Sequence, residues 1–484
     1  MITFTIALFT LIVGYWLYGG YMNRIFAPDD RPTPATTRND GIDYIKMPTW
    51  KLYLIQFLNI AGLGPIFGAI MGAQFGTACF IWIVLGTIFA GAVHDFFSGT
   101  LSIRNNGESL PEIIGRYLGK IPKDVMCVIS VFLMILVGAV FVSGPAELLA
   151  KFTPESMGLT FWVLVVFGYY LIATILPIDK VIGKVYPVFA AALLFMAVGI
   201  LVMLYVTSPD LPEMWESMGT NYEDSPIFPV MFVTISCGAI SGFHATQSPM
   251  VARCMDHEKH CRPVFYGAMV TEGIVALIWA AAGTCFYQEH GGIIDPATGK
   301  EFTGAAVAFT LSKSWLGTVG GILAILGIIA APISTGDTAL RAVRLMVADF
   351  FKIKQHTILR RIAVSIPIFA ATTALLLYCL SGSAGFKMIW RYLAWTNQLL
   401  AVFTLWAITV YLVKERKNFY ITLIPALFMT LVCSTYIMIS PEGFTLSADI
   451  SNATGAVCTV ISAVWFILWY RRERKNVDIG IIKQ

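Results

Sequence analysis

Ionisable side chains that could do chemistry stand at three places inside or at the edge of long apolar stretches of this 484-residue chain. They are the adjacent pair His94 and Asp95, then His244, and then Asp337. If these stretches cross a membrane, each charge costs at least ~2.5–3.5 kcal/mol to insert, so each residue invites a functional explanation. Histidines and carboxylates can carry protons, and carboxylate, hydroxyl and carbonyl oxygens can hold hard cations. These residue types therefore suggest proton or cation binding within a membrane.

A cation site near Asp337 is one specific hypothesis. Ser334 and Thr335 come just before Asp337 and offer two hydroxyls next to a carboxylate. Such oxygens suit a hard cation, and a poorly solvated carboxylate can hold a proton instead. A structural explanation stands beside it, because Arg341 follows Asp337 by four residues and such a pair is favourable on a helix face.

His94 and Asp95 lie near the end of their apolar stretch. Adjacent residues on a helix point in different directions, so we do not expect these two side chains to form a dyad. They could act as a gate by holding the polar segment 101–123, in which we expect Arg104 to be the partner. Glu272 lies near the end of another stretch, as does Glu147, and we expect solvent to reach both.

Two other chemistries follow from residue types alone. Ser241 and His244 could be the nucleophile and base of a hydrolase, although no third group supports them. A second possibility is a zinc site, because four potential metal ligands lie close together at Cys254, His257, His260 and Cys261. Their spacing differs from that of a standard zinc motif. No nucleotide-binding loop occurs. We therefore predict neither an enzyme nor a bound cofactor, and keep the four metal candidates as a minor alternative.

The composition indicates a membrane protein. Hydrophobic residues make up 57% of the chain and charged residues only 13%, whereas soluble globular proteins carry about 25% charged residues. The small net charge of +4 argues against a nucleic-acid partner. The nine cysteines fit no disulfide framework, and residues 2–21 lack the basic leader of a cleavable signal peptide.

Thirteen segments are apolar over the roughly 20 residues that a membrane-spanning helix needs. The predicted spans are residues 2–21, 52–75, 77–99, 125–149, 159–176, 185–206, 227–248, 264–287, 316–335, 357–380, 389–412, 419–439 and 452–470. A shorter apolar piece at 305–311 is expected to be an extracellular helix. The sequence thus predicts an all-α polytopic membrane protein with about 13 transmembrane helices.

The basic residues alternate between the two sides that this count defines. With the N-terminus outside, the cytoplasmic segments hold 28 of the chain's 33 Lys and Arg residues. They are 22–51, 101–123, 177–184, 251–263, 336–361, 413–418 and 471–484. Cytoplasmic loops are enriched in Lys and Arg, so we predict an outside N-terminus and a cytoplasmic C-terminus in a bacterial inner membrane.

Spans two and seven each contain a helix break near the bilayer midplane. The first break is Gly62-Leu63-Gly64-Pro65, and the second runs from Ser236 to Gly242. Glycines of this kind can be close-packing contacts, but interrupted helices at matching positions point to a transporter binding site. Spans five apart cross in opposite directions, which predicts an inverted five-plus-five repeat.

The predicted organisation places one extra helix before the repeats and two after them. In order it comprises a peripheral helix at 1–21, repeats at 52–206 and 227–412, two additional helices at 419–470 and a basic cytoplasmic tail at 471–484.

Several motifs, in order along most of the chain, resemble the carbon starvation protein (CstA) family. They are Asn59–Gly68, Gly91–Phe96, Cys237–His244, Ile333–Thr338 and the pair Asn397-Gln398. The resemblance implies a LeuT-like fold of the amino acid–polyamine–organocation (APC) superfamily. It also implies ion-driven uptake of short peptides in starvation, or alternatively of pyruvate or another small carboxylate with protons; a channel is less favoured.

Two departures indicate a short form of this family. Longer members carry C-terminal sequence beyond the end of this chain, and they have Ser-Gly-Thr-Thr after the histidine of span seven. Here Ala245-Thr246-Gln247-Ser248 follows His244.

Substrate, either a peptide or pyruvate, is expected between the two breaks. The residues predicted to bind it are Gly62, Gly64, Pro65, Gly238, Ser241, His244, Asn397 and Gln398. Superfamily members that use sodium bind it between the first break and a hydroxyl pair, which places ion coupling at Ala61, Ser334, Thr335 and Asp337. The relatives suggest protons more than sodium. The predicted gate is His94, Asp95 and Arg104.

Overall fold

The computed structural model describes residues 1–41, 43–175, 178–222, 226–296, 299, 301–355, 357–380 and 383–478. Every regular element among these residues is helical. The predicted tail at 471–484 is therefore described only as far as residue 478, where the last helix ends.

Long helices alternate with short helical turns along the chain. The α-helices are α1 (Ile2–Phe26), α2 (Pro34–Thr37), α3 (Thr49–Ile60), α4 (Ala69–Gly72), α5 (Ala78–Gly86), α6 (Ala92–Arg104), α7 (Leu110–Leu118), α8 (Lys120–Phe152), α9 (Leu159–Ile175), α10 (Ile178–Thr207), α11 (Met214–Ser217), α12 (Ile227–Thr234), α13 (Gly242–Ala252), α14 (Ala268–His290), α15 (Gly304–Ala324), α16 (Ala330–Phe350), α17 (Ile358–Leu380), α18 (Ser383–Lys414), α19 (Tyr420–Ile439) and α20 (Ala448–Asp478). The 3-10 and π-helical turns are η1 (Gly64–Gly68), η2 (Ala73–Phe75), η3 (Thr87–Gly91), η4 (Glu155–Met157), η5 (Glu258–His260), η6 (Arg262–Gly267) and η7 (Ile325–Ile329).

Nine helices in the described ranges are long and apolar enough to cross a membrane, or ten if one bent pair counts as a single span. A shorter apolar helix covers Leu159–Thr174, where a span was predicted. The broken segment around α12 and α13 does not qualify as a long helix, since neither half reaches the required length. The protein is thus a multi-pass helical membrane protein, and the count of thirteen spans stays a prediction.

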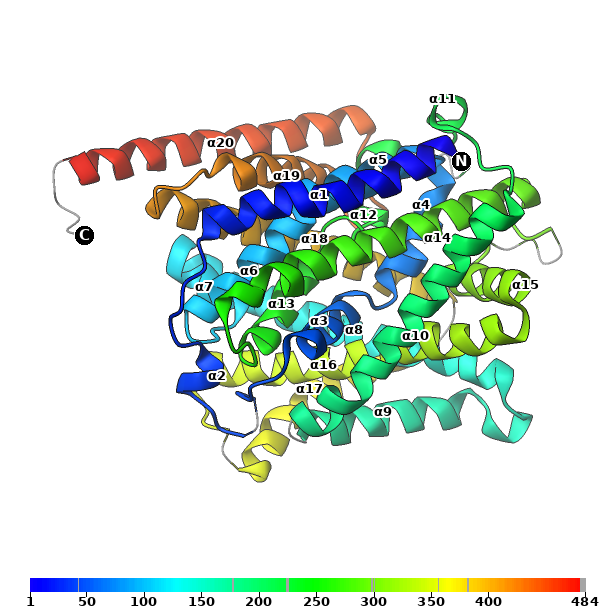
Figure 1. The fold of residues 1–484 in the computed structure, drawn as a ribbon, viewed down its shortest axis with the longest axis horizontal. Coiled ribbons are helices and arrows are strands. Elements are labelled where there is room, and N and C mark those ends of the chain that lie inside the picture. Colours follow the sequence, from blue (N-terminus) through cyan, green and yellow to red (C-terminus); the bar gives the residue numbers. More distant parts are fainter. Residues whose placement is uncertain are drawn as a thin grey trace.

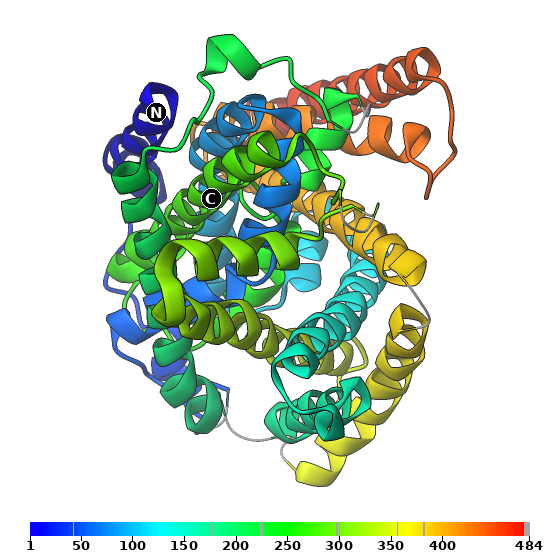
Figure 2. The same ribbon diagram turned by 90° about the vertical axis from the view of Figure 1, so that its right-hand side faces the viewer.

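The two interrupted segments lie in the middle of the bundle (Figure 1). α3 and α13 are flanked on one side by α1, α19 and α20, and on the opposite side by α9 and α17, a separation that Figure 2 also shows. α13 packs against α3, α6, α16 and α18. Because the segments that sequence analysis singled out are enclosed by other helices, their free backbone groups face protein and not lipid.

Both predicted breaks are present. α3 ends at Ile60, and the chain resumes at Gly64 after a bend of 54°. α12 ends at Thr234, and α13 begins at Gly242, with Ser241 in an extended conformation. Proline and glycine weaken the helix in the first segment, and the second contains two glycines, so both breaks lie where the local sequence predicts them.

One predicted span ends too early. It was expected to stop at residue 335, before a cytoplasmic segment at 336–361, but α16 continues to Phe350. The side chains of Arg341 and Arg344, which marked that segment as cytoplasmic, are 0% and 1% exposed. Arg341 donates through Nη2 to the carbonyl oxygen of Ala173, and its Nη1 lies 3.9 Å from Asp43 Oδ1. A hydropathy count ends at the first arginines, so it shortens a helix whose arginines face the interior.

Candidate functional site

The two breaks touch each other. A Cβ built on Gly64 would lie 2.2 Å from the Cβ of Cys237, and one on Gly68 would lie 3.0 Å from the carbonyl oxygen of Thr234. Only glycine allows this approach, because real Cβ atoms essentially never come within 3.0 Å of another heavy atom. The structure therefore brings the predicted binding segments around Gly62–Pro65 and Gly238–His244 into direct contact.

Asn397 and Gln398 on α18 hold the second break open. Asn397 Oδ1 accepts hydrogen bonds from the Ser241 hydroxyl at 3.0 Å and from the Phe243 amide at 2.6 Å. Gln398 Nε2 donates to the carbonyl oxygen of Ile240 at 3.1 Å. These bonds satisfy backbone groups that the interruption frees. Both amides thus lie at the break, as predicted, and bridge two helices there.

The carbonyl groups of the second break also find a donor. The Thr87 hydroxyl donates to the carbonyl oxygen of Gly238 at 3.0 Å. A Cβ on Gly91 would lie 2.2 Å from the carbonyl oxygen of Ala239, so η3 packs closely on the same segment. The break is consequently braced from two sides, by α18 and by η3.

Four ionisable side chains form a continuous buried chain next to this break. His94 Nδ1 lies 2.8 Å from Asp95 Oδ1, and His244 Nδ1 lies 2.9 Å from Asp95 Oδ2. On the far side of the imidazole, His244 Nε2 lies 3.4 Å from Glu272 Oε2. All four side chains are 0% exposed. We call this group the His–Asp–His–Glu cluster.

The cluster corrects two expectations. Asp95 does contact its neighbour His94, because Nδ1 and Oδ1 lie close enough to their own backbones to meet across one residue step. Glu272 on α14 is buried against His244, not solvated near the end of its span. Sequence analysis missed Glu272 as a site residue, although a carboxylate in a span was a signal that could have identified it.

Arg104 has a different partner from the one predicted. Its Nη2 lies 3.0 Å from Glu258 Oε2, its Nε lies 3.1 Å from Glu258 Oε1, and its guanidinium lies 3.9 Å from the centre of the Phe26 ring. This fork-like pair, in which Glu258 is fully and Arg104 partly buried, joins the end of α6 to η5. The predicted pairing of Arg104 with His94 or Asp95 is wrong, because the Asp95 carboxylate bonds instead to His94 and to His244 on α13.

Asp337 is held by tyrosines. Its Oδ2 accepts hydrogen bonds from Tyr186 at 2.8 Å and from Tyr169 at 3.4 Å. Arg341, the helix-face partner considered above, contacts the carbonyl oxygen of Ala173 and the carboxylate of Asp43. Asp337 is fully buried, so its two tyrosine hydroxyls replace water as donors to the carboxylate.

Thr335 lies against the first break, where a cation site was predicted. Its hydroxyl is 3.1 Å from the carbonyl oxygen of Leu58 and 3.0 Å from that of Ala331. A Cβ on Gly62 would lie 3.3 Å from Thr335 Oγ1. The Ser334 hydroxyl turns back to the carbonyl oxygen of Ala331 at 2.7 Å. Of the two hydroxyls predicted to bind a cation, that of Thr335 donates a hydrogen bond to α3, whereas that of Ser334 bonds within its own helix segment.

Two amides just before the first break have no recorded partner. Gln56 and Asn59 are 0% and 1% exposed, and none of their four side-chain nitrogen and oxygen atoms accepts or donates a hydrogen bond to a described residue. They are three residues apart on α3 and so share one helix face. A buried polar group without a partner costs roughly 1–3 kcal/mol, which makes these amides candidates for contacting a ligand.

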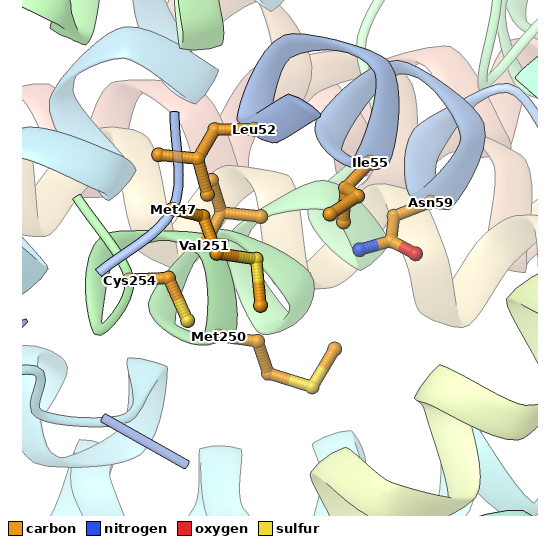
Figure 3. Close-up of a pocket in the computed structure, with 7 residues that line it drawn as sticks. All are labelled: Met47, Leu52, Ile55, Asn59, Met250, Val251 and Cys254. Atoms are coloured by element: carbon orange, nitrogen blue, oxygen red, sulfur yellow. The ribbon is translucent and has the colours of Figure 1, made fainter. Parts of the chain in front are cut away.

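A small pocket lies beside Asn59. Its walls come from the segment leading into α3, from α3 itself and from the end of α13, and Asn59 lies at one end (Figure 3). The lining residues are Met47, Leu52, Ile55, Asn59, Met250, Val251 and Cys254. Its volume of ≈ 10 Å³ is about that needed for one water molecule, so this pocket is too small for pyruvate or a peptide.

The four metal candidates do not converge. His257 Nε2 lies 2.9 Å from Asp30 Oδ1, and His260 Nδ1 lies 3.0 Å from Asp256 Oδ1. Burial raises the pKa of the Cys254 thiol to about 12, which opposes the thiolate that zinc requires. Among the residues that the structure describes, no three His, Cys, Asp or Glu side chains are placed to hold a metal ion.

Ser241 and His244 are not arranged as a hydrolase pair. The Ser241 hydroxyl donates to Asn397, while the two ring nitrogens of His244 face Asp95 and Glu272. A serine nucleophile needs its base within hydrogen-bond reach. His244 is engaged by carboxylates, which suits the handling of protons better than the activation of a hydroxyl.

Known proteins resemble this chain in sequence. It is 41% identical over 347 residues to an uncharacterized membrane protein of Haemophilus influenzae, covering 61% of this chain and 94% of that one. It is 26% identical over 462 residues to the peptide transporter CstA of Campylobacter jejuni, with 81% and 62% covered. It is 27% identical over 343 residues to the pyruvate/proton symporter BtsT of Escherichia coli, with 56% and 47% covered. The matched part thus spans less than two thirds of either named transporter.

Solved transporter structures share the fold. A manganese transporter of Eremococcus coleocola matches with a TM-score of 0.56 at 11% identity, covering 90% of this chain and 99% of that one. A sodium-coupled sialic acid symporter matches with a TM-score of 0.54 at 15% identity, covering 95% and 96%. At these identities the likeness concerns the fold alone.

A family described as carbon starvation protein CstA matches residues 1–161, 150–315 and 302–436. These overlapping matches cover nearly the whole helical bundle, including both breaks and the His–Asp–His–Glu cluster. The chain therefore belongs to the carbon starvation protein CstA family.

Proposed function

We propose that this protein is a secondary active transporter that imports short peptides across the bacterial cytoplasmic membrane, driven by an ion gradient, during carbon or nutrient starvation. The observation that carries the proposal is the contact between the two helix breaks, at Gly64 and Cys237. Substrate sites of transporters lie where discontinuous helices meet near the midplane, because freed backbone groups there can bind polar ligands. The relatives named as transporters support the same class.

The proposal includes an inverted five-plus-five repeat within thirteen spans. Residues 52–206 would form the first repeat and 227–412 the second, so that α3 and α12–α13 hold equivalent positions. The two interrupted segments lie in the middle of the bundle (Figure 1), and their breaks touch at Gly64 and Cys237, which supports the repeat. The shared fold with a sodium-coupled symporter supports this arrangement.

Substrate would bind between the breaks, in contact with Gly62, Gly64, Pro65, Gly238, Ser241, His244, Asn397 and Gln398. We add Gln56 and Asn59, whose unpartnered amides offer both donors and acceptors on the first break's helix. Peptides and pyruvate each carry a carboxylate, and the N-terminus of α13 offers it a favourable dipole end. In this structure Asn397 Oδ1 caps the Phe243 amide, so substrate would have to displace or extend that bond.

Ion coupling has two candidate positions. The first is the predicted set Ala61, Ser334, Thr335 and Asp337, in which Thr335 bonds the last turn of α3. The second is the His–Asp–His–Glu cluster. The predicted gate of His94, Asp95 and Arg104 would act in two parts, with the Arg104–Glu258 pair closing the cytoplasmic side.

Transport of pyruvate or another small carboxylate with protons is the second candidate function. The 27% identity to a pyruvate/proton symporter favours it. Both candidates need the same carboxylate contacts, so substrate size separates them, and uptake must be measured for each.

Reconstituted proteoliposomes test the proposal. Purified protein would be supplied with labelled dialanine or labelled pyruvate under an imposed pH gradient, then a sodium gradient, with protein-free liposomes as the control. We expect concentrative uptake of dialanine under the pH gradient. Uptake of pyruvate alone would select the second candidate. Failure to accumulate either substrate under either gradient would end the proposal.

A further inference from the structure

We propose that the coupling proton is carried by the pair His244 and Glu272, with Asp95 and His94 completing a buried relay, and not by Asp337. The inference rests on the proposed transport function and specifies its coupling site. Three separate elements supply the residues: α6 carries His94 and Asp95, α13 carries His244, and α14 carries Glu272.

The contacts fix the direction in which each ring donates. An ionised carboxylate only accepts hydrogen bonds, so Asp95 accepts from Nδ1–H of His94 at 2.8 Å and from Nδ1–H of His244 at 2.9 Å. His244 Nε2 then faces Glu272 Oε2 at 3.4 Å, and neither of these buried atoms has a hydrogen-bond partner among the described residues. The two atoms thus make an ion-pair contact and not an aligned hydrogen bond, and one proton can sit on either of them.

The charge on the cluster makes that proton obligatory while the site is closed. Without it, a Glu272 carboxylate would face the lone pair of Nε2, with a second carboxylate, Asp95, on the other side of the same ring. Both carboxylates are 0% exposed, and an uncompensated buried charge is strongly unfavourable. The pair can therefore release its proton only when water or a conformational change reaches it.

Among the described residues, no lysine or arginine acts on the cluster to replace the positive charge of a protonated histidine. The titratable groups that act on Glu272 are His244 on α13, Cys237 in the break and Asp95 on α6. Those recorded for His244 are Asp95, Glu272 and Cys237. Asp95 in turn faces His94 and His244. Positive charge at the cluster has to come from protonated histidine.

The ends of the relay are open to further proton transfer. Nε2 of His94 and Oε1 of Glu272 are buried, and neither has a hydrogen-bond partner among the residues with described positions. Both belong to side chains that are 0% exposed. A buried polar atom without a partner is destabilising, so a water molecule or another proton carrier that reached either end would stabilise the cluster.

The second break links this proton to substrate. His244 is the third residue of α13, and Cys237 and Ser241 precede it in the same interruption. Substrate that contacts this segment would shift α13 relative to α14. Such a shift lengthens the His244–Glu272 contact and exposes the proton.

The proton step balances within the pair. The Glu272 carboxylic acid gives its proton to Nε2 of neutral His244, leaving a carboxylate and an imidazolium whose Nδ1–H stays bonded to Asp95. Release to water from the imidazolium regenerates the neutral ring. Uptake from the opposite side by the carboxylate completes the cycle, with no other reactant.

The test uses full-length protein in proteoliposomes with an entrapped pH dye, labelled dialanine and labelled pyruvate. For wild type, a one-unit pH gradient with the potential clamped at zero supports accumulation of up to about tenfold per coupled proton. Glu272→Gln should let substrate equilibrate to a ratio of about one, with the dye signal lost. Asp95→Asn, a second variant, should do the same.

One control and one discriminating variant make the result specific. Glu112→Gln, the same change at a partly exposed residue paired with Lys123, should accumulate substrate as wild type does. Asp337→Asn separates the two candidate coupling positions: a retained response to the pH gradient supports the cluster, and a lost response with intact substrate exchange overturns it. Normal accumulation by both Glu272→Gln and Asp95→Asn would overturn the inference, as would wild-type uptake that moves no protons; the proposed function would survive either result. Wild type that accumulates neither probe would instead remove the proposed function itself.

Discussion

A Cβ atom on Gly64 would lie 2.2 Å from the Cβ and 2.3 Å from the Sγ of Cys237, so the first interrupted helix presses its backbone directly on the second. This contact joins two segments that are far apart in sequence. Any side chain at residue 64 must push the breaks apart, and the close approach is a feature that variants can probe.

Gly64→Ala should abolish substrate uptake or reduce it to a small fraction of the wild-type rate. Overpacking of this kind costs typically ~1–3 kcal/mol, because either backbone or Cys237 has to move. Adding Cys237→Gly to Gly64→Ala should restore part of the uptake by removing the clashing atoms. Gly168→Ala is the matched control, since a Cβ there meets nothing within 4 Å. Full uptake by Gly64→Ala alone would contradict this view of the contact.

Asn59→Leu should raise thermal stability in detergent while reducing uptake by roughly tenfold or more. The buried amide has no recorded partner, so an apolar side chain of similar size removes an unfavourable burial, and loss of one substrate hydrogen bond is worth about a factor of ten. The measurements are the unfolding midpoint and the KM for the transported substrate. Asn105→Leu, which loses a bond to the Leu101 carbonyl oxygen, should not gain stability. If Asn59→Leu is destabilised and binds substrate normally, the amide is structural.

The Glu213 carboxylate should make the protein less stable against unfolding as the pH falls below about 5. Burial raises its pKa, but hydrogen bonds from the Met1 amino group and from Thr3 and Ile2 outweigh this and hold the pKa at about 2, below its ordinary 4.5. A carboxyl with a lowered pKa stabilises the fold above pH 4.5 and loses that contribution as pH falls toward 2.

We therefore expect the unfolding temperature of wild type to drop more between pH 5 and pH 3 than that of Glu213→Gln. This range lies roughly between the unfolded and the folded pKa of Glu213, where the stabilising contribution is lost. Glu155→Gln, an exposed residue in η4, is the matched control and should follow wild type. Equal pH dependence of Glu213→Gln and wild type would show that the Glu213 contacts do not stabilise α1.

Reporter fusions should place Asp210 outside and Lys259 in the cytoplasm. The reason is the concentration of Lys and Arg in alternate segments, which favours retention of those segments on the cytoplasmic side. Alkaline phosphatase and green fluorescent protein fusions at each position give opposite signals, and each serves as the other's control. A cytoplasmic signal at Asp210 would reverse the proposed orientation, and the same signal at both sites would contradict the inverted repeat.

Some features could be predicted from the sequence because their causes are local. Apolar stretches identify membrane helices through burial in lipid, and Pro65 with its flanking glycines breaks α3 whatever surrounds it. The motifs that resemble the CstA family lie within single segments for the same reason. The position of Asn397 and Gln398 beside the second break was also expected, although from the family resemblance and not from geometry.

The tertiary structure decided which side chains meet. Glu272 looked solvated near the end of its span, and only the tertiary fold brings α14 close enough for this carboxylate to reach His244 on α13. Arg104 had a nearby candidate partner in sequence, yet it pairs with Glu258, 154 residues further along the chain. The rotation of each helix about its axis is set by contacts with several neighbours at once. The hydropathy of the sequence alone does not determine that rotation. For this reason the sequence determined the helices and their breaks, while the structure alone determined the buried His–Asp–His–Glu cluster beside the second break.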